Sequence, residues 1–136
     1  MTSKDIPYRF EKTMGAALSM EAVEIHPEKM VIRMPITDAS RQPAGLLHGG
    51  ATAALVETVA SLGSAIQCPK GFMPVGIEVN CNHLRGKSEG VIEAVGVPVH
   101  RGRRTHVWDV KVYDEDRKMI AIGRCTVAIT PIEKND

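Results

Sequence analysis

The stretch GLLHGGATAALVETVASLGSAI, from Gly45 to Ile66, decides how the rest of the chain can fold. Gly49 and Gly50 give a helix a flexible start, and Pro69 would end it. Apolar residues recur at helical spacing on one face, while the opposite face is small and nearly uncharged. We expect a long helix that protein surrounds on all sides. The apolar face carries Leu55, Val59, Leu62 and Ile66, and the small face carries Ala53, Glu57, Ser61 and Ser64.

Glu57 is the only ionisable side chain between Gly49 and Ile66. A lone glutamate on an apolar helix is usually a structural residue that is paired or hydrogen-bonded. No Lys or Arg lies within this helix to pair with it, and the small residues on its face leave room for a ligand. We therefore treat Glu57 as a candidate functional carboxylate, with the structural role as the alternative.

The residues His48, Gly49 and Gly50 at the helix start are suited to holding an anion. The first N–H groups of a helix have no intrahelical partner and lie at its positive end. Glycine lets another molecule approach the backbone closely, so this site could stabilise the oxyanion that forms when a carbonyl is attacked. A plain helix start capped by His48 is the alternative. Glu57 lies two turns, roughly 11 Å, further along, so one substrate can use both groups only by lying along the helix or by meeting Glu57 of a second chain.

After Pro74 the apolar period changes to two, as in β-strands. In WDVKVYD, from residue 108 to 114, apolar side chains alternate strictly with polar ones. Short loops between such segments imply hairpins, and therefore an antiparallel sheet that curves around the helix in an α+β domain. We expect strands over Ala16–His26, Lys29–Ile36, Val75–Val79, Val91–Val99, His106–Tyr113 and Met119–Thr130, a short helix over Asp5–Thr13 and a loop over Thr37–Ala44.

Composition limits the possible functions. The 136 residues fit one domain, 1–136. A net charge of +1, with two Phe, two Tyr and one Trp, argues against binding to nucleic acid or to an anionic membrane. Three cysteines that are far apart in the sequence argue against a disulfide framework and favour a reducing compartment. Without a signal-like or membrane-spanning stretch, we expect a soluble cytoplasmic protein.

Several other kinds of site find little support. The five histidines show no metal-ligand spacing with Cys or with one another, so we expect no metal. No G-x-S-x-G is present, which argues against a serine nucleophile. Ser61, one turn after Glu57, could hold a water or bond the backbone four residues before it. The basic stretches 85–87 and 100–105 are either solvated hairpin tips or a clamp for phosphates.

The segment QPAGLLHGG (42–50), followed by Glu57, Thr58 and Ser61, resembles the hotdog-fold acyl-CoA thioesterases. It is most similar to the branch with a Gly-Gly and Glu pattern. That branch includes 4-hydroxybenzoyl-CoA thioesterase, the proofreading thioesterase of enterobactin synthesis and 1,4-dihydroxy-2-naphthoyl-CoA thioesterase. The similarity spans roughly residues 43–129. Downstream it includes Val75–Asn80, Asn82, His83, Arg85, Val107 and Trp108.

The resemblance implies a hotdog fold, in which an antiparallel sheet of about five or six strands wraps one long helix. Chains would pair through their sheets into dimers, and dimers into a homotetramer. The site would lie between two subunits, where the helix start of one chain faces Glu57 of its neighbour. Neither a metal nor a redox cofactor would be needed, since coenzyme A is part of the substrate.

The resemblance also implies catalytic roles. The Gly49 N–H would hold the thioester oxygen, while Gln42 and His48 help to position and polarise that group. Glu57 would act as a general base on water, or attack directly to give a mixed anhydride. The water or the acyl group would be ordered by Thr58 and Ser61.

Further residues would line the coenzyme A portion. In some relatives a second His follows the one at 83, whereas this chain has Leu84, and residues 1–39 match no motif of the family. Arg101, Arg103 and Arg104 would lie near the phosphates. The lining would comprise Gly76, His83, Leu84, Arg85, Gly86, His100, Arg101, Gly102, Arg103, Arg104 and Thr105.

The expected function is therefore hydrolysis of aryl- or acyl-CoA thioesters to free acid and coenzyme A. One alternative on the same fold is a dehydratase or hydratase, which needs a His and a carboxylate placed around a double bond, and the Gly-Gly helix start argues against it. The other is a non-catalytic acyl-CoA-binding protein. The sequence does not specify the acyl group.

Overall fold

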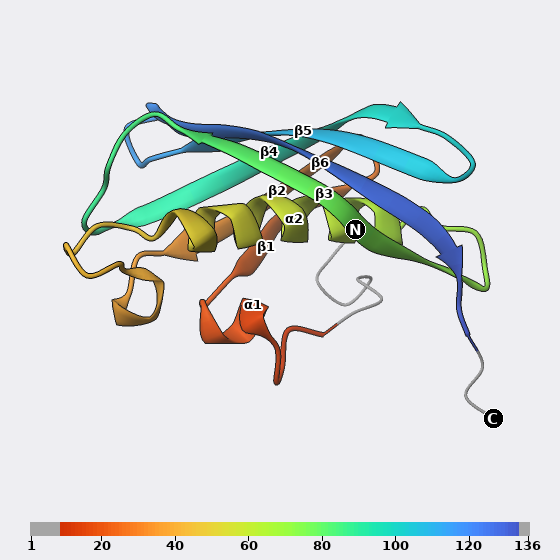
Figure 1. Ribbon diagram of the computed structural model, residues 1–136, viewed down its shortest axis with the longest axis horizontal. Coiled ribbons are helices and arrows are strands. Elements are labelled where there is room, and N and C mark those ends of the chain that lie inside the picture. The colour runs from red at the N-terminus through yellow and green to blue at the C-terminus, as the bar shows by residue number, and fades with distance from the viewer. Residues whose placement is uncertain (1–8, 134–136) are drawn as a thin grey trace.

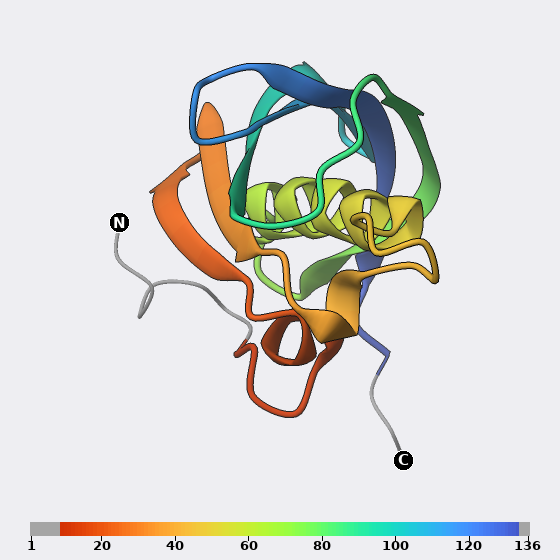
Figure 2. The ribbon, with the colours of Figure 1, turned by 90° about the vertical axis from the view of Figure 1, so that its left-hand side faces the viewer.

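One long helix lies in the concave face of an antiparallel sheet in the computed structural model, which describes residues 9–133 (Figure 1). The end-on view shows the sheet curling around this helix (Figure 2). The six strands run in the order β1-β2-β4-β5-β6-β3, so β1 and β3 form the two edges. The predicted α+β class, with a sheet wrapped around one helix, is confirmed. The elements are α1 (Met14–Ala17), β1 (Glu21–His26), β2 (Lys29–Pro35), η2 (Asp38–Ser40), α2 (Gly49–Ala65), β3 (Phe72–His83), β4 (Val91–Arg101), β5 (Thr105–Tyr113) and β6 (Met119–Pro131).

The long helix α2 begins and ends close to the predicted residues. Its apolar face is buried against the sheet, with Leu55 and Val59 fully inaccessible to solvent. Close packing with β5 requires a glycine at position 63, because a Cβ there would lie 2.4 Å from an atom of the Trp108 ring. The expectation that protein covers the helix on all sides is wrong for the single chain, because the sheet ends at β3 and leaves Glu57 exposed.

The predicted pattern of β5 is confirmed. Trp108, Val110 and Val112 all point into the core and are fully buried, whereas the residues between them are partly or fully exposed. The hairpins on both sides of β5 pair it with β4 and β6 in antiparallel register. This central strand therefore contributes a row of fully buried side chains to the core between the sheet and α2.

The N-terminal predictions need correction. Residues 5–8 of the predicted helix lie outside the described part of the chain, and residues 9–13 are not helical. A short helix instead begins at Met14, where the Thr13 hydroxyl caps it by accepting a hydrogen bond from the Ala16 N–H. The strand expected from Ala16 therefore begins only at Glu21.

The predicted strand Val75–Val79 is much longer in the structure, where β3 pairs with β6 from Phe72 to His83. Two features hide its length in the sequence. A register shift between Gly76 and Glu78 breaks the alternation of apolar and polar residues. In addition, β3 is an edge strand, so apolar side chains such as Ile77 face solvent in the single chain.

A buried polar cluster ties the second half of α2 to β5. The Trp108 Nε1–H donates a hydrogen bond of 2.9 Å to the Ser64 hydroxyl, and His106 Nδ1 lies 2.9 Å from the same oxygen. A neutral imidazole can accept the Ser64 proton at Nδ1. Burial lowers the pKa of His106, and the nearby charges of Arg101 and His100 lower it further. His106 is therefore held neutral inside the fold.

Protonation of His106 predicts a specific loss of stability in acid. Because the folded-state pKa lies below the ordinary value of 6.5, the unfolded chain binds the proton more readily. This stability is present above pH 6.5 and is lost as the pH falls from there through the folded-state pKa. We expect the free energy of unfolding to fall between pH 7.5 and pH 5, with one proton contributing at most about 1.4 kcal/mol per pH unit.

Denaturant titrations of the wild type and of His106→Gln at several pH values measure this effect. The variant should be less stable at pH 7.5 and should lose less stability on acidification, since carboxylates titrate equally in both proteins. Parallel curves for the two proteins would show that His106 does not cause the acid sensitivity.

Candidate functional site

The start of α2 offers one unoccupied backbone donor. His48 Nδ1 accepts a hydrogen bond of 2.7 Å from the Gly50 N–H, and the His48 carbonyl accepts from the N–H groups of Ala51 and Thr52. Among the described residues, no group accepts a hydrogen bond from the Gly49 N–H. His48 thus caps the helix, as one of the two predicted roles for this residue requires. Its imidazole binds the Gly50 N–H and leaves the Gly49 N–H free for a ligand.

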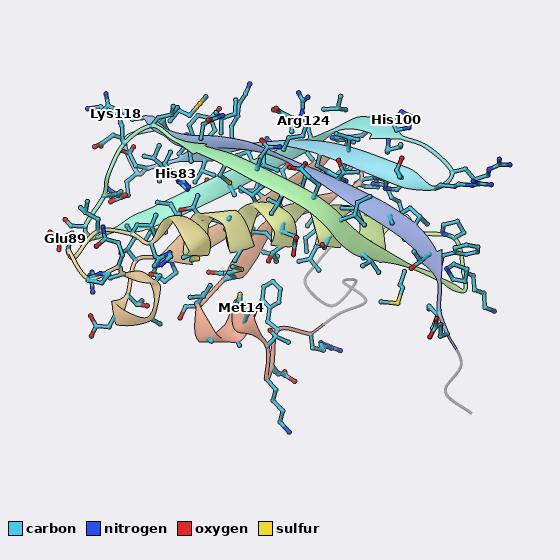
Figure 3. All side chains as sticks on the ribbon, in the orientation of Figure 1. Met14, His83, Glu89, His100, Lys118 and Arg124 are labelled. Atoms are coloured by element: carbon cyan, nitrogen blue, oxygen red, sulfur yellow. The ribbon has the colours of Figure 1, made fainter. Side chains whose placement is uncertain are left out.

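A surface depression of about 280 Å³ opens beside this amide. His83, at the end of β3, closes one side of it and lies above the first turns of α2 (Figure 3). The contact is close, because a Cβ on Gly49 would lie 3.0 Å from His83 Nε2. Any larger residue at position 49 would press on this imidazole. The lining comprises Gln42, Leu46, Leu47, Gly49, His83, Leu84, Arg85, Gly86 and Lys87.

The depression brings together six of the site residues predicted from the sequence, which come from the loop before α2 and from the end of β3. The Gln42 side-chain carbonyl accepts a hydrogen bond from the Ala44 N–H within its own loop. The Gln42 NH₂ group donates to no other described residue, so it can face a ligand. Gln42 and Gly49 therefore both line this depression with an N–H group that no described residue accepts.

Leu46 and Leu47 had no predicted role, and Lys87 was expected only as part of the basic stretch 85–87, a candidate clamp for phosphates. The Lys87 ammonium forms an ion pair of 3.0 Å with Glu115, and this hydrogen-bonded contact raises the pKa of the lysine. Leu46 and Leu84 are large apolar side chains that remain exposed at the rim. An exposed leucine next to a glycine-rich helix start is a weak sequence signal, because single exposed apolar residues are common.

Glu57 lies apart from this depression in the single chain. Its carboxylate forms no ion pair among residues 9–133, so the structural alternative of a salt-bridged glutamate is not what the structure contains. Glu57 packs on β3 instead, where a Cβ on Gly76 would lie 2.8 Å from its Oε1. Burial, and then the Glu57 charge, raise the pKa of Cys125 to about 12. An unpaired carboxylate thus stands at the edge of the core.

Two hydroxyl groups flank Glu57 on α2. The Thr58 hydroxyl donates a hydrogen bond of 2.6 Å to the Ala54 carbonyl, so its proton is engaged and its oxygen can only accept further hydrogen bonds. Ser61, one turn later, is half-buried and makes no side-chain hydrogen bond among the described residues. Ser61 is therefore the freer donor of the two. Ser64, which was expected on the same face, is buried beneath β5.

The basic hairpin between β4 and β5 lies at the other end of the sheet. Figure 3 places His100 and His83 at opposite ends of the molecule. Arg101 is engaged, since it forms an ion pair of 2.6 Å with Glu28 and donates a hydrogen bond to Gln67. The residues predicted to line the coenzyme A portion of the substrate are therefore not together in the single chain. One group, from His83 to Gly86, lines the depression, and the other, from His100 to Thr105, lies on the β4–β5 hairpin. Arg101, Arg103 and Arg104 are all exposed, and no described residue forms an ion pair with Arg103 or Arg104.

Within residues 9–133, no group of three His, Cys, Asp or Glu side chains could hold a metal ion. No helix in the same range is long and apolar enough to cross a membrane.

Comparison with known proteins identifies the family. Residues 44–121 match the Thioesterase superfamily. The 1,4-dihydroxy-2-naphthoyl-CoA hydrolase of Listeria monocytogenes is 37% identical over 112 residues, which cover 82% of this chain and 91% of that protein. The proofreading thioesterase EntH of Cronobacter turicensis is 33% identical over 117 residues, which cover 86% of this chain and 85% of that protein.

Solved structures agree with this assignment. A crystal structure of a glutamine-to-alanine mutant of thioesterase PA1618 from Pseudomonas aeruginosa superposes with a TM-score of 0.87 at 36% identity, over 90% of this chain and 89% of that one. The protein SAV0944 from Staphylococcus aureus, with a glutamate replaced by alanine, superposes with a TM-score of 0.85 at 41% identity, over 88% of this chain and 99% of that one. The chain therefore belongs to the Thioesterase superfamily and is a thioester hydrolase.

Proposed function

We propose that the protein hydrolyses acyl- or aroyl-CoA thioesters to free acid and coenzyme A. A thioester bound at Gly49 of one chain would be attacked with the help of Glu57 from a second copy. The observation that carries the proposal is the coexistence of an unoccupied helix-start amide and an unpaired carboxylate on one helix, two turns or roughly 11 Å apart, a separation that a second copy of the chain would bridge.

The helix start supplies electrostatic stabilisation. As the thioester carbonyl is attacked, its oxygen becomes an oxyanion, which the Gly49 N–H would bind at the positive end of α2. The Gln42 NH₂ group lines the same depression and would donate a second hydrogen bond. A donor of this kind contributes typically about 10²–10³-fold in rate. His48 would act indirectly. The hydrogen bond that its Nδ1 accepts from the Gly50 N–H fixes the loop that presents Gly49.

Glu57 supplies the proton transfer or the nucleophile. As a general base it would take a proton from water while that water attacks the carbonyl carbon. As a nucleophile it would form a mixed anhydride that water then cleaves. Both routes need an ionised carboxylate without a salt-bridge partner. Ser61 and the Thr58 oxygen lie beside it on α2 and would orient the water or the acyl group.

Mutants crystallised from a relative support these two assignments. SAV0944, described as a thioesterase enzyme, was crystallised once with a glutamine and once with a glutamate replaced by alanine. Those two residues are fifteen positions apart in that protein, the same separation as Gln42 and Glu57 in this chain.

The shape of the sheet supports a dimer formed through β3. The edge strand β1 presents Glu24, which forms an ion pair with Lys29 of β2, and charged side chains on an edge discourage pairing with another strand. The β3 edge instead exposes Val75 by 43% and Ile77 by 60%. Pairing of two β3 edges would bury these side chains and place Glu57, which packs on β3, at the seam. A further pairing of dimers into a tetramer is part of the proposal.

The names of two relatives support a CoA thioester as the substrate. One is named for a 1,4-dihydroxy-2-naphthoyl-CoA substrate and the other for thioesterase proofreading. The exposed arginines of the β4–β5 hairpin, Arg103 and Arg104, together with Arg85 in the depression, would contact the phosphates of coenzyme A. The three free cysteines fit the reducing environment of the cytoplasm, which we propose as the location.

Replacement of Glu57 tests the chemistry. Glu57→Gln should lower kcat by at least about 10²-fold, since the general base is lost. The fold should persist, because the side chain is exposed and unpaired. The measurement is release of free thiol from a panel of aromatic and straight-chain CoA esters. Glu11→Gln, which removes an equal charge outside the site, is the control and should keep wild-type turnover. Near wild-type turnover of Glu57→Gln would remove this residue from the mechanism.

Complementation between chains tests the shared site. Glu57→Gln and Gln42→Ala should each be nearly inactive alone. In a mixed dimer, Gln42 from the first variant and Glu57 from the second would form one intact site. Co-expression of the two should restore about a quarter of wild-type turnover, since half of randomly assembled dimers are mixed and each holds one intact site. Co-expressed chains that stay as inactive as the single variants would place both residues of a site in one chain.

A further inference from the structure

Gly76 lies where the carboxyl end of Glu57 crosses the edge strand β3. A Cβ at this position would lie 2.8 Å from Glu57 Oε1, 3.0 Å from its Cδ and 3.3 Å from its Cγ. Three atoms of one side chain therefore rest against the Gly76 backbone. The carboxyl group reaches the sheet edge through space that exists only because position 76 has no side chain.

The backbone at position 76 does not itself require glycine. Gly45, Gly71 and Gly90 have positive φ angles, which explains why glycine occupies those positions, but Gly76 does not. Glycine within a strand is destabilising by roughly 0.5–1 kcal/mol relative to alanine. Its presence in β3 therefore calls for a local reason, and position 76 offers two: the register shift between Gly76 and Glu78, and the contact with Glu57.

We propose that Gly76 is a positioning residue for catalysis, which keeps the Glu57 carboxylate in its reactive place at the β3 edge. The proposal rests on the role of Glu57 proposed above. It replaces the role implied by the family resemblance, in which Gly76 lines the coenzyme A portion. The two roles predict different kinetics, because a residue that binds coenzyme A affects KM and a residue that acts through Glu57 affects kcat.

An added methyl group would displace the carboxylate at little cost to the fold. The atoms that it meets are the far end of a flexible side chain, so Glu57 can rotate away. A misplacement of about 1 Å at a reacting group can lower the rate by up to about 10²-fold. We expect Gly76→Ala to lower kcat by about 10-fold and to change KM by less than about twofold. The thermal unfolding midpoint should not fall.

The control is Gly15→Ala in α1. A Cβ there would lie 3.0 Å from the Phe10 ring, a contact about as close as the one at position 76. Because Gly15 does not touch Glu57, the Gly15→Ala variant should have the kcat and KM of the wild type. The pair of variants separates displacement of Glu57 from the general effect of adding a methyl group to a tightly packed glycine.

A double-mutant cycle completes the test. In a Glu57→Ala background there is no carboxylate to displace, so Gly76→Ala should leave the residual thiol-release rate within about twofold. A tenfold loss in that background, or a raised KM with unchanged kcat in the single variant, would overturn the positioning role. Failure of the proposed function itself would show separately, as wild-type turnover of the Glu57→Ala single variant.

Discussion

The packing of α2 into the concave face of the sheet is the contact on which the rest of the molecule depends. Trp108 and its neighbours on β5 fix how deep the helix lies, and Gly63 allows the close approach. Once α2 is held there, its N-terminal amide must emerge beside the end of β3, and Glu57 must emerge where the sheet stops. The buried cluster of Ser64, His106 and Trp108 holds the other half of the helix in register with the sheet.

The free edge of strand β3 links the packing of α2 to the proposed catalysis, because Glu57 lies beside it. A catalytic carboxylate must stay ionised and unpaired, and yet lie in a site that excludes bulk water. In a single chain Glu57 forms no ion pair with a described residue, but it is exposed beyond β3, so bulk water reaches it. A second copy on the β3 edge would satisfy the second condition and also bring a helix-start amide within reach. On this account, oligomerisation and catalysis are consequences of the same free strand edge.

The sequence predicted well whatever depends on local periodicity. The start of α2 follows from its two glycines and the inward face of β5 from the alternation of apolar residues, and both are confirmed. The features that the sequence did not predict depend on contacts between residues far apart in the chain. The burial of Ser64 depends on how far the sheet curls, and Arg101 meets a glutamate from a turn more than seventy residues before it. The length of β3 was hidden because an edge strand with a bulge does not alternate, and no local signal links Gly76 to Glu57.

A crystal structure of the protein with a non-hydrolysable CoA thioester analogue would show which chain supplies each half of the site. We expect the carbonyl oxygen of the analogue to lie about 3 Å from the Gly49 nitrogen of one chain. The nearest glutamate to the carbonyl carbon should be Glu57 from the adjoining chain, within reach directly or through one water. A carbonyl held by Gly49 and Glu57 of the same chain, or a Glu57 carboxylate closed into an ion pair, would contradict this arrangement.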